Sequence, residues 1–295
     1  MRDFALNNSH KPLLGVLLIL GACLLLATHD GLSKYLTQFY PVLLIVWARY
    51  LAQTVLMAGL FAPRMGRRVF RTRRPWLQLA RGLSLVGISI LFISGLTYIP
   101  LAEATAVIFL TPLLVTIASA MLGEPVRRSQ WLAVGCGLLG VLIIVRPGGA
   151  LFTPAILLPF GAAVCFTLYQ LLTRRLSSTD HPVTSNFLSS LVGTLVMSAL
   201  VLLDWRTPTL QDAAMMAALG AMAMCGHLLL THAFRFASAA MLAPFTYAQI
   251  IFAGVVGVIL FGHAPDLGAT LGMAVIIASG LGMAWVQGRQ SRPMN

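Results

Sequence analysis

Long apolar stretches separated by short polar connections dominate the hydropathy pattern of this chain. An α-helix needs about 20 apolar residues to cross a hydrocarbon core about 30 Å thick. Ten stretches come close to this length, at residues 12–32, 41–62, 77–97, 101–122, 129–146, 153–173, 184–203, 213–233, 238–261 and 267–287. The pattern therefore predicts an all-α polytopic membrane protein with ten transmembrane helices.

Composition supports a lipid environment. Of the 295 residues, 58% are hydrophobic and only 9% are charged, whereas soluble domains contain about 25% charged residues. The net charge of +12 could suggest a nucleic-acid partner, but the basic residues lie in short connections between apolar stretches, where membrane orientation explains them. We therefore expect a lipid bilayer and a small-molecule substrate as partners, and no nucleic acid.

The basic residues also predict the orientation of the chain, because Lys and Arg are retained on the cytoplasmic side of short loops. The connection 63–76 contains Arg64, Arg67, Arg68, Arg71, Arg73 and Arg74 and no acid. With this connection inside, sixteen basic residues fall on the inner side and three on the outer side, while Arg49 lies within a helix. We expect both termini in the cytoplasm, a cell inner membrane location, and contact between the arginines and anionic lipids.

Two segments of similar character suggest an internal repeat. Residues 96–102 and 234–240 lie about 139 residues apart, and each precedes a helix that contains a proline, Pro112 or Pro244. Because each half has five helices, an odd number, the second half must enter the membrane from the opposite side. We predict two inverted five-helix repeats, at 1–147 and 148–295, which is the usual frame for alternating access.

Motifs for other chemistry are missing from the sequence. Neither Lys11 nor Lys34 follows the glycine of a phosphate-binding loop, and the GxSxG and HExxH patterns are absent. The four cysteines lie within apolar stretches without metal-ligand spacing, so we expect inert, buried thiols. We predict no enzymatic activity, no metal and no cofactor.

Several short motifs resemble a known transporter family. They are Ala102-Glu103-Ala104, Leu110-Thr111-Pro112 and Gly123-Glu124-Pro125 in the first half, and Leu242-Ala243-Pro244-Phe245 with Phe261-Gly262 in the second. Together with ten helices in two repeats, they resemble the EamA-type group of the drug/metabolite transporter superfamily. The resemblance implies secondary transport, most often efflux, of amino acids, nucleobases, sugars or related metabolites. His263 departs from the family, which often carries an acid there.

Arg49 is the only cation that the sequence places well inside a helix, about 12 Å from its outer end. A charge at this depth costs at least about 2.5 kcal/mol, so it should face the bundle interior or water. Arg49 could bind a substrate carboxylate or phosphate. It could equally be a structural residue that binds helix carbonyls or a hydroxyl.

Two acids, Glu103 and Asp30, could couple transport to protons if partial burial brings their pKa toward neutral. Glu103 begins the fourth helix near the outer face. The alternative for Glu103 is stabilisation by the helix dipole, and the alternative for Asp30 is a position at the water interface.

Other polar residues within the helices are candidates for a central pocket. Binding candidates are Trp47, Tyr169, Gln170, Tyr247 and Gln249, while Asn186, His29, His227 and His232 are further polar groups. Interhelical hydrogen bonds are the competing explanation for each of them. Pro112 and Pro244 should kink their helices and act as hinges.

These features predict a secondary transporter, an exporter of a small polar or zwitterionic metabolite such as an amino acid or an opine-type metallophore. An importer of a metabolite such as riboflavin or S-adenosylmethionine is the alternative within this class. A membrane scaffold without transport is the alternative of another class. The sequence is compatible with a monomer or a homodimer.

Overall fold

The computed structural model describes residues 12–123, 128–146, 153–176, 179–236, 242 and 245–290, and within these ranges every regular element is a helix. The earlier elements are α1 (Pro12–Leu36), α2 (Val42–Met65), η1 (Gly66–Phe70), α3 (Pro75–Leu96), α4 (Leu101–Ile108), α5 (Thr111–Met121) and α6 (Arg128–Val145). The later elements are η2 (Pro154–Ile156), α7 (Leu157–Leu176), α8 (Pro182–Leu200), η3 (Val201–Leu203), α9 (Leu210–Phe236), α11 (Ala248–Phe261) and α12 (Leu267–Gln290).

The lengths and hydropathy of these helices are those of a polytopic membrane protein. In the described ranges, seven helices are long and apolar enough to cross a membrane, and three shorter apolar helices cover Gln130–Val145, Ala248–Phe261 and Leu267–Gly282. The total of ten spans remains a prediction, and part of the predicted span 238–261 lies outside the described residues. Large apolar side chains such as Leu142 and Ile259 are exposed on the outer helix faces, which suits contact with lipid.

The predicted helix 101–122 is broken in the structure. α4 ends at Ile108 and α5 begins at Thr111, because Pro112 has no backbone N–H and its ring excludes a normal helical bond to the carbonyl of Ile108. The hydroxyl of Thr111 donates a 2.6 Å hydrogen bond to that carbonyl. The break occurs where Pro112 predicts it, whereas Pro244 lies outside the described residues.

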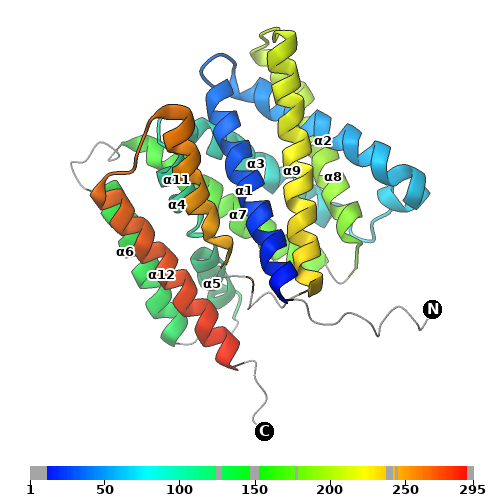
Figure 1. Ribbon diagram of the computed structural model, residues 1–295. Helices are drawn as coiled ribbons and strands as arrows, with labels where there is room; N and C mark the ends of the chain where they lie inside the picture. Colours follow the sequence, from blue (N-terminus) through cyan, green and yellow to red (C-terminus); the bar gives the residue numbers. More distant parts are fainter. Residues whose placement is uncertain are drawn as a thin grey trace.

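The helices pack against one another as a bundle (Figure 1). α12 lies along α6, α1 along α9 and α3 along α7, while α2 contacts both α8 and α9. Helix α1 begins and α12 ends toward the lower side of Figure 1, so the two outermost described helices have their terminal ends on one side of the bundle. Which side faces the cytoplasm remains a prediction.

Several helix contacts of the first half have a counterpart in the second half. In this comparison α1, α2, α3 and α6 correspond to α7, α8, α9 and α12. The contact of α1 with α9 corresponds to that of α3 with α7, and the contact of α2 with α9 corresponds to that of α3 with α8. The contacts of α2 with α8 and of α6 with α12 each correspond to themselves. Two related halves would produce this pattern, and the repeat itself remains a prediction.

Glycines allow the closest of these helix contacts. A Cβ atom on Gly140 of α6 would lie 2.8 Å from the carbonyl oxygen of Gly272 in α12. A Cβ atom on Gly220 of α9 would lie 2.7 Å from the carbonyl oxygen of Arg49 in α2. Side chains at Gly140 and Gly220 would therefore push these helix pairs apart. The pair α2–α9 contains Arg49, which belongs to the candidate site described below.

Polar ties connect loops of the two halves at both ends of the α2–α8 pair. At one end, the Asp180 carboxylate accepts hydrogen bonds from Thr72 Oγ1 and, at 2.8 Å, from Gln78 Nε2. At the other end, the Asp212 carboxylate accepts 2.6 Å hydrogen bonds from the hydroxyls of Tyr40 and Thr209. We call these contacts the Asp180 tie and the Asp212 tie.

Candidate functional site

Arg49 lies inside the bundle, as the sequence predicts. It is the eighth residue of α2, about 10 Å along the helix axis from Val42, and its side chain is only 7% exposed. Its guanidinium carbon lies 4.5 Å from the centroid of the Tyr50 ring. The buried Nε atom has no hydrogen-bond partner, and in the described part of the chain no carboxylate forms an ion pair with Arg49.

Polar groups from three neighbouring helices face the same interior. On α1, Nδ1 of His29 lies 2.9 Å from Oδ1 of Asp30, and Gln249 of α11 donates a 3.5 Å hydrogen bond from Nε2 to the other Asp30 oxygen. His29, and His227 of α9, are both within electrostatic range of Arg49. We call this set the central polar group, and it consists of His29, Asp30, Arg49, Gln53, His227 and Gln249.

Three buried atoms of the central polar group have no protein partner among the described residues. They are Nε2 of His29, Nε of Arg49 and Oε1 of Gln53. A buried polar atom without a partner costs about 1–3 kcal/mol, so such atoms require a bound molecule or water. Gln53 was missed in the sequence, although its position four residues after Arg49 places both residues on one helix face.

Arg81 is a second buried cation, and the sequence places it near the inner end of the predicted span 77–97. It lies in the second turn of α3 and is 2% exposed. Its guanidinium donates to the hydroxyls of Thr173, Ser189 and Tyr169, to the carbonyl of Ser185 and to Oδ1 of Asn186. All parts of this guanidinium have partners, so Arg81 connects α3 to α7 and α8.

The hydrogen bonds of Arg81 account for the polar groups of Tyr169 and Asn186 inside the bundle. The Tyr169 hydroxyl accepts a 2.5 Å hydrogen bond from Arg81, and the guanidinium carbon lies 4.4 Å from the Tyr169 ring centroid. Both residues therefore take part in the interhelical hydrogen bonds that were the alternative to substrate binding. The neighbouring Gln170 is half-buried.

Trp47 lies away from the central polar group. Its Nε1 donates a 2.9 Å hydrogen bond to Ser198 of α8, and its ring packs edge to face against Trp205. Trp47 and Arg49 are two residues apart in a helix and so point in different directions. His232 also differs from expectation, because its Nδ1 bonds the Leu228 carbonyl in an exposed position.

Tyr247 is buried next to the break between α4 and α5. Its ring lies 5.4 Å from that of Phe109, centroid to centroid. On its other side it packs against α12, where a Cβ atom on Gly280 would lie 1.9 Å from the Tyr247 hydroxyl oxygen. Tyr247 thus fills the space between the α4–α5 break and α12.

Glu103 forms a second buried polar site, separate from the central polar group. It lies in the first turn of α4, is 2% exposed, and its Oε2 has no hydrogen-bond partner among the described residues. Its Oε1 is 3.8 Å from Nε2 of His263, and Lys34 is within electrostatic range. Lys34 donates to the carbonyls of Leu96 and Ile99, which close the C-terminal end of α3.

Asp30 is deeper than predicted. Helix α1 continues to Leu36, six residues beyond Asp30, and the Asp30 side chain is only 14% exposed. The helix continues past the end of the predicted span 12–32, and the position of Asp30 relative to the water interface remains a prediction.

The cysteines differ from expectation as well. Cys23 is buried and Cys165 is half-buried, but Cys136 and Cys225 are exposed, because they face away from the neighbouring helices. Among the described residues, no group of three or more His, Cys, Asp or Glu side chains is arranged to hold a metal ion.

Sequence comparisons relate the chain to transporters. The model of the EamA-like transporter family matches residues 13–146 and 153–285. A riboflavin transporter of Vibrio cholerae is 30% identical over 280 residues, which cover 93% of this chain and 94% of that protein. A pseudopaline exporter of Pseudomonas aeruginosa is 28% identical over 268 residues, which cover 90% of this chain and 94% of that protein.

Two further comparisons agree with these. An S-adenosylmethionine uptake transporter of Rickettsia prowazekii is 24% identical over 278 residues, covering 94% of each chain. A chain of known crystal structure superimposes with a TM-score of 0.67 at 22% identity, covering 94% of this chain and 99% of that one. The structural likeness shows that the two chains share a fold.

Proposed function

This chain belongs to the EamA-like transporter family of the drug/metabolite transporter superfamily, and from that premise we propose that it exports a small polar or zwitterionic metabolite. We place the protein in the cell inner membrane, with both termini in the cytoplasm. We propose that the anionic part of the substrate, a carboxylate or phosphate, binds Arg49.

The observation that supports this proposal is a buried arginine whose charge has no counter-ion among the described residues. A buried ion is costly unless a partner and hydrogen bonds compensate it, and a charge within a membrane span is retained for function in most proteins. The contrast with Arg81 is informative, because Arg81 is equally deep and fully hydrogen-bonded. The guanidinium Nε of Arg49 lacks a hydrogen-bond partner among the described residues. The guanidinium group is therefore available to a ligand that binds and dissociates in each transport cycle.

The other members of the central polar group could bind the rest of the substrate. His29 Nε2 and Gln53 Oε1 are buried and have no partner among the described residues, so a ligand that contains both donors and acceptors would satisfy them. Gln249 and the carboxylate of Asp30 could bind a cationic part. This combination of groups favours a zwitterionic molecule, and amino acids or amino-acid-derived compounds are the class that we propose.

Alternating access is the mechanism that we propose. The matched helix contacts support two related halves, and the two ties lie at opposite ends of the α2–α8 pair. Breaking the Asp180 tie while the Asp212 tie stays closed would open the site to one side only, and the reverse would open it to the other. The breaks at Pro112 and next to Tyr247 would be the hinges, with Pro244 proposed as the partner of Pro112.

We propose that Glu103 takes up the coupling proton. Its carboxylate is buried with one unpartnered oxygen, whereas both oxygens of Asp30 are within hydrogen-bonding reach of other side chains. A group that binds and releases protons during a cycle needs such an incompletely bonded state.

Uptake is the alternative direction. The relatives named for S-adenosylmethionine uptake favour it, while the pseudopaline exporter favours export. Flux measured with substrate first inside and then outside sealed vesicles, under an imposed proton gradient, decides between them.

The test of the proposal uses purified protein in liposomes with radiolabelled glutamate, S-adenosylmethionine and riboflavin. We expect saturable flux of at least one probe. Arg49→Gln should reduce its affinity about ten- to a hundredfold, because a charge-assisted bond contributes about 1.5–3 kcal/mol. Arg49→Lys should retain part of the affinity, and the exposed Arg74→Gln serves as the control of equal charge change.

Two results would contradict this proposal. Unchanged kinetics in Arg49→Gln would remove Arg49 from the binding site. Absence of saturable flux for every probe, with protein that is folded and inserted, would favour the membrane scaffold without transport.

A further inference from the structure

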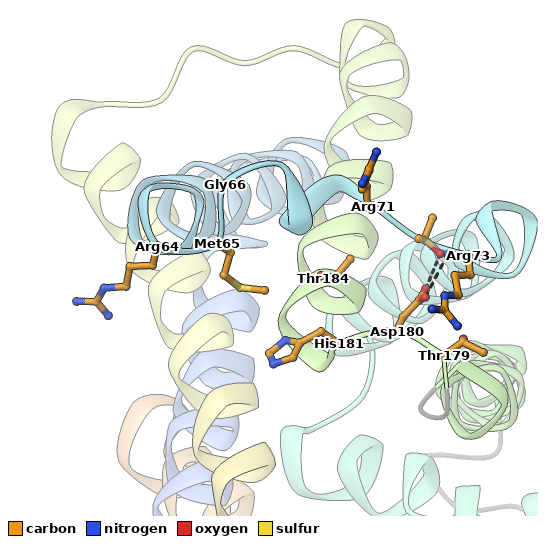
Figure 2. A pocket seen from close by; sticks show the side chains of 10 residues that line it. Arg64, Met65, Gly66, Arg71, Arg73, Thr179, Asp180, His181 and Thr184 are labelled. Atoms are coloured by element: carbon orange, nitrogen blue, oxygen red, sulfur yellow. Dashed lines mark hydrogen bonds between the residues drawn. The ribbon is translucent and has the colours of Figure 1, made fainter. Parts of the chain in front are cut away.

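A cationic cavity lies at one end of the bundle, away from the central polar group. It has a volume of about 910 Å³ and lies between the end of α2, the segment 71–73 and the loop that precedes α8. Figure 2 shows the cavity with the side chains that line it. Its walls therefore come from both halves of the chain.

The backbone forms this cavity through a turn that requires glycine. α2 ends at Met65, and the φ of 56° at the following Gly66 lies in the left-handed region that side chains disfavour. The chain turns there into η1 and returns along 71–73. This turn places Arg64 on one side of the cavity and Arg71 and Arg73 on the other, as Figure 2 shows.

The described lining contains three arginines, Arg64, Arg71 and Arg73, and one carboxylate, Asp180. The Asp180 carboxylate accepts hydrogen bonds from Thr72 Oγ1, from Gln78 Nε2 at 2.8 Å and from the backbone N–H of Arg73 at 3.3 Å. Its oxygens are thus used to hold the wall of the cavity. The three guanidinium groups form no ion pair within the described ranges.

His181 and the start of α8 add donors to the cavity. Nδ1 of His181 accepts a 3.2 Å hydrogen bond from the backbone N–H of Val183, so the proton of the neutral ring is on Nε2, which can donate to a ligand. The first turn of α8 carries partial positive charge. Cationic groups, an N–H donor and a helix start around one cavity are the chemistry that binds phosphate oxygens.

From this arrangement we propose that the cavity binds a phosphate group. In Figure 2, Arg64 extends outward from the end of α2, and Arg73 lies beside Asp180. Exposed arginines along the cavity wall suit a group with several oxygens that stays partly in solvent. The loop joins two membrane-spanning helices, so the phosphate can come from the headgroup of an anionic lipid or from a soluble molecule. The proposal does not depend on the transported substrate.

The test measures binding by the full-length protein, without a transport assay. One arm titrates inorganic phosphate into protein in neutral detergent and records the thermal unfolding temperature. The other arm reconstitutes the protein in nanodiscs of phosphatidylcholine with or without phosphatidylglycerol, and detects retained lipid by native mass spectrometry. A response in the first arm alone identifies a soluble source, and a response in the second alone identifies lipid.

Adjacent arginines provide a matched control for the variants. Arg73 and Arg74 are both exposed and carry the same charge, but only Arg73 lines the cavity. We expect Arg73→Gln, and Arg71→Gln as a second variant, to weaken phosphate or lipid binding about tenfold. Arg74→Gln should change binding less than twofold, and Arg73→Lys should retain most of it.

Equal losses in Arg73→Gln and Arg74→Gln would overturn the proposal, because a diffuse surface potential would then explain the binding. Failure of the unaltered protein to respond in either arm would also overturn it.

Discussion

The rings of Phe109 and Tyr247 meet inside the bundle, 5.4 Å apart and tilted by 48°. Phe109 lies in the break between α4 and α5, and Tyr247 immediately precedes α11. The two residues are separated by 138 positions, close to the repeat spacing in the sequence. An irregular backbone segment from each half is therefore held at one aromatic contact.

The fit of Tyr247 against α12 predicts a strong effect of Gly280→Ala. The new methyl group would lie 1.9 Å from the tyrosine hydroxyl, and overpacking of this kind costs about 1–3 kcal/mol. We expect a lower thermal unfolding temperature, restored in part by Tyr247→Leu in the same chain. The control is Gly282→Ala, where nothing lies within 4 Å and the change should stay within about 1 kcal/mol. Equal stability of the two alanine variants would contradict the packing.

Glu103→Gln tests proton coupling. The variant should still bind substrate, but transport in liposomes should lose its dependence on the proton gradient, because an amide cannot take up the proton. Asp30→Asn is the comparison, and it should keep that dependence. Flux of Glu103→Gln that responds to pH like that of the unaltered protein would assign coupling to another group.

The alanine variants of Arg81 and Arg49 should differ in stability, although both arginines are buried. Arg81→Ala would leave several buried acceptors on α7 and α8 without a donor, at about 1–3 kcal/mol for each. We expect loss of at least about 3 kcal/mol, or of folded protein, on size-exclusion chromatography and thermal unfolding. Arg49→Ala should remain folded, and similar stability of both variants would argue against the structural role of Arg81.

The Asp180 tie should make stability depend on pH in the acid range. Burial raises the pKa of Asp180, but hydrogen bonds from Thr72, Gln78 and the Arg73 backbone outweigh it and leave the pKa below the ordinary value of 3.8. A lowered pKa stabilises the fold above the unfolded value, and this contribution is lost as pH falls through the folded value.

As the pH falls from about 6 to about 3, the thermal unfolding temperature of Asp180→Asn should therefore decrease less than that of the unaltered protein. At neutral pH it should be less stable by about 1 kcal/mol. The control is Asp204→Asn on the opposite end of α8, which is exposed and should follow the unaltered protein. Parallel pH curves for Asp180→Asn and the unaltered protein would show that the tie does not contribute.

Accessibility of single cysteines tests the membrane topology. Tyr98, between α3 and α4, is 72% exposed and should lie outside, whereas Arg71 should lie inside. In a background with all four native cysteines replaced by serine, an impermeant maleimide should label Tyr98→Cys in intact cells and Arg71→Cys only after permeabilisation. The reversed pattern would invert the orientation, and with it the side from which Glu103 takes up protons.

The sequence by itself determined most of the helix positions. The apolar stretches 41–62 and 77–97 became α2 and α3 within a few residues, because hydropathy and length are local properties that lipid imposes on each segment. The break at Pro112 was likewise predictable from the sequence, since the missing backbone N–H of a proline disrupts the helix that contains it. The burial of Arg49 followed from its depth within a span.

Only the tertiary structure decided which polar groups have partners. Arg81 was counted only among the basic residues of the inner side, yet residues about 90 to 110 positions later complete its hydrogen bonds, while Arg49 received none from the described chain. Trp47 and Tyr169, both candidates for a pocket, turned out to bond Ser198 and Arg81. The physical reason is that a hydrogen bond needs two groups within about 3 Å in a defined direction, and helix packing, not spacing along the chain, brings such groups together.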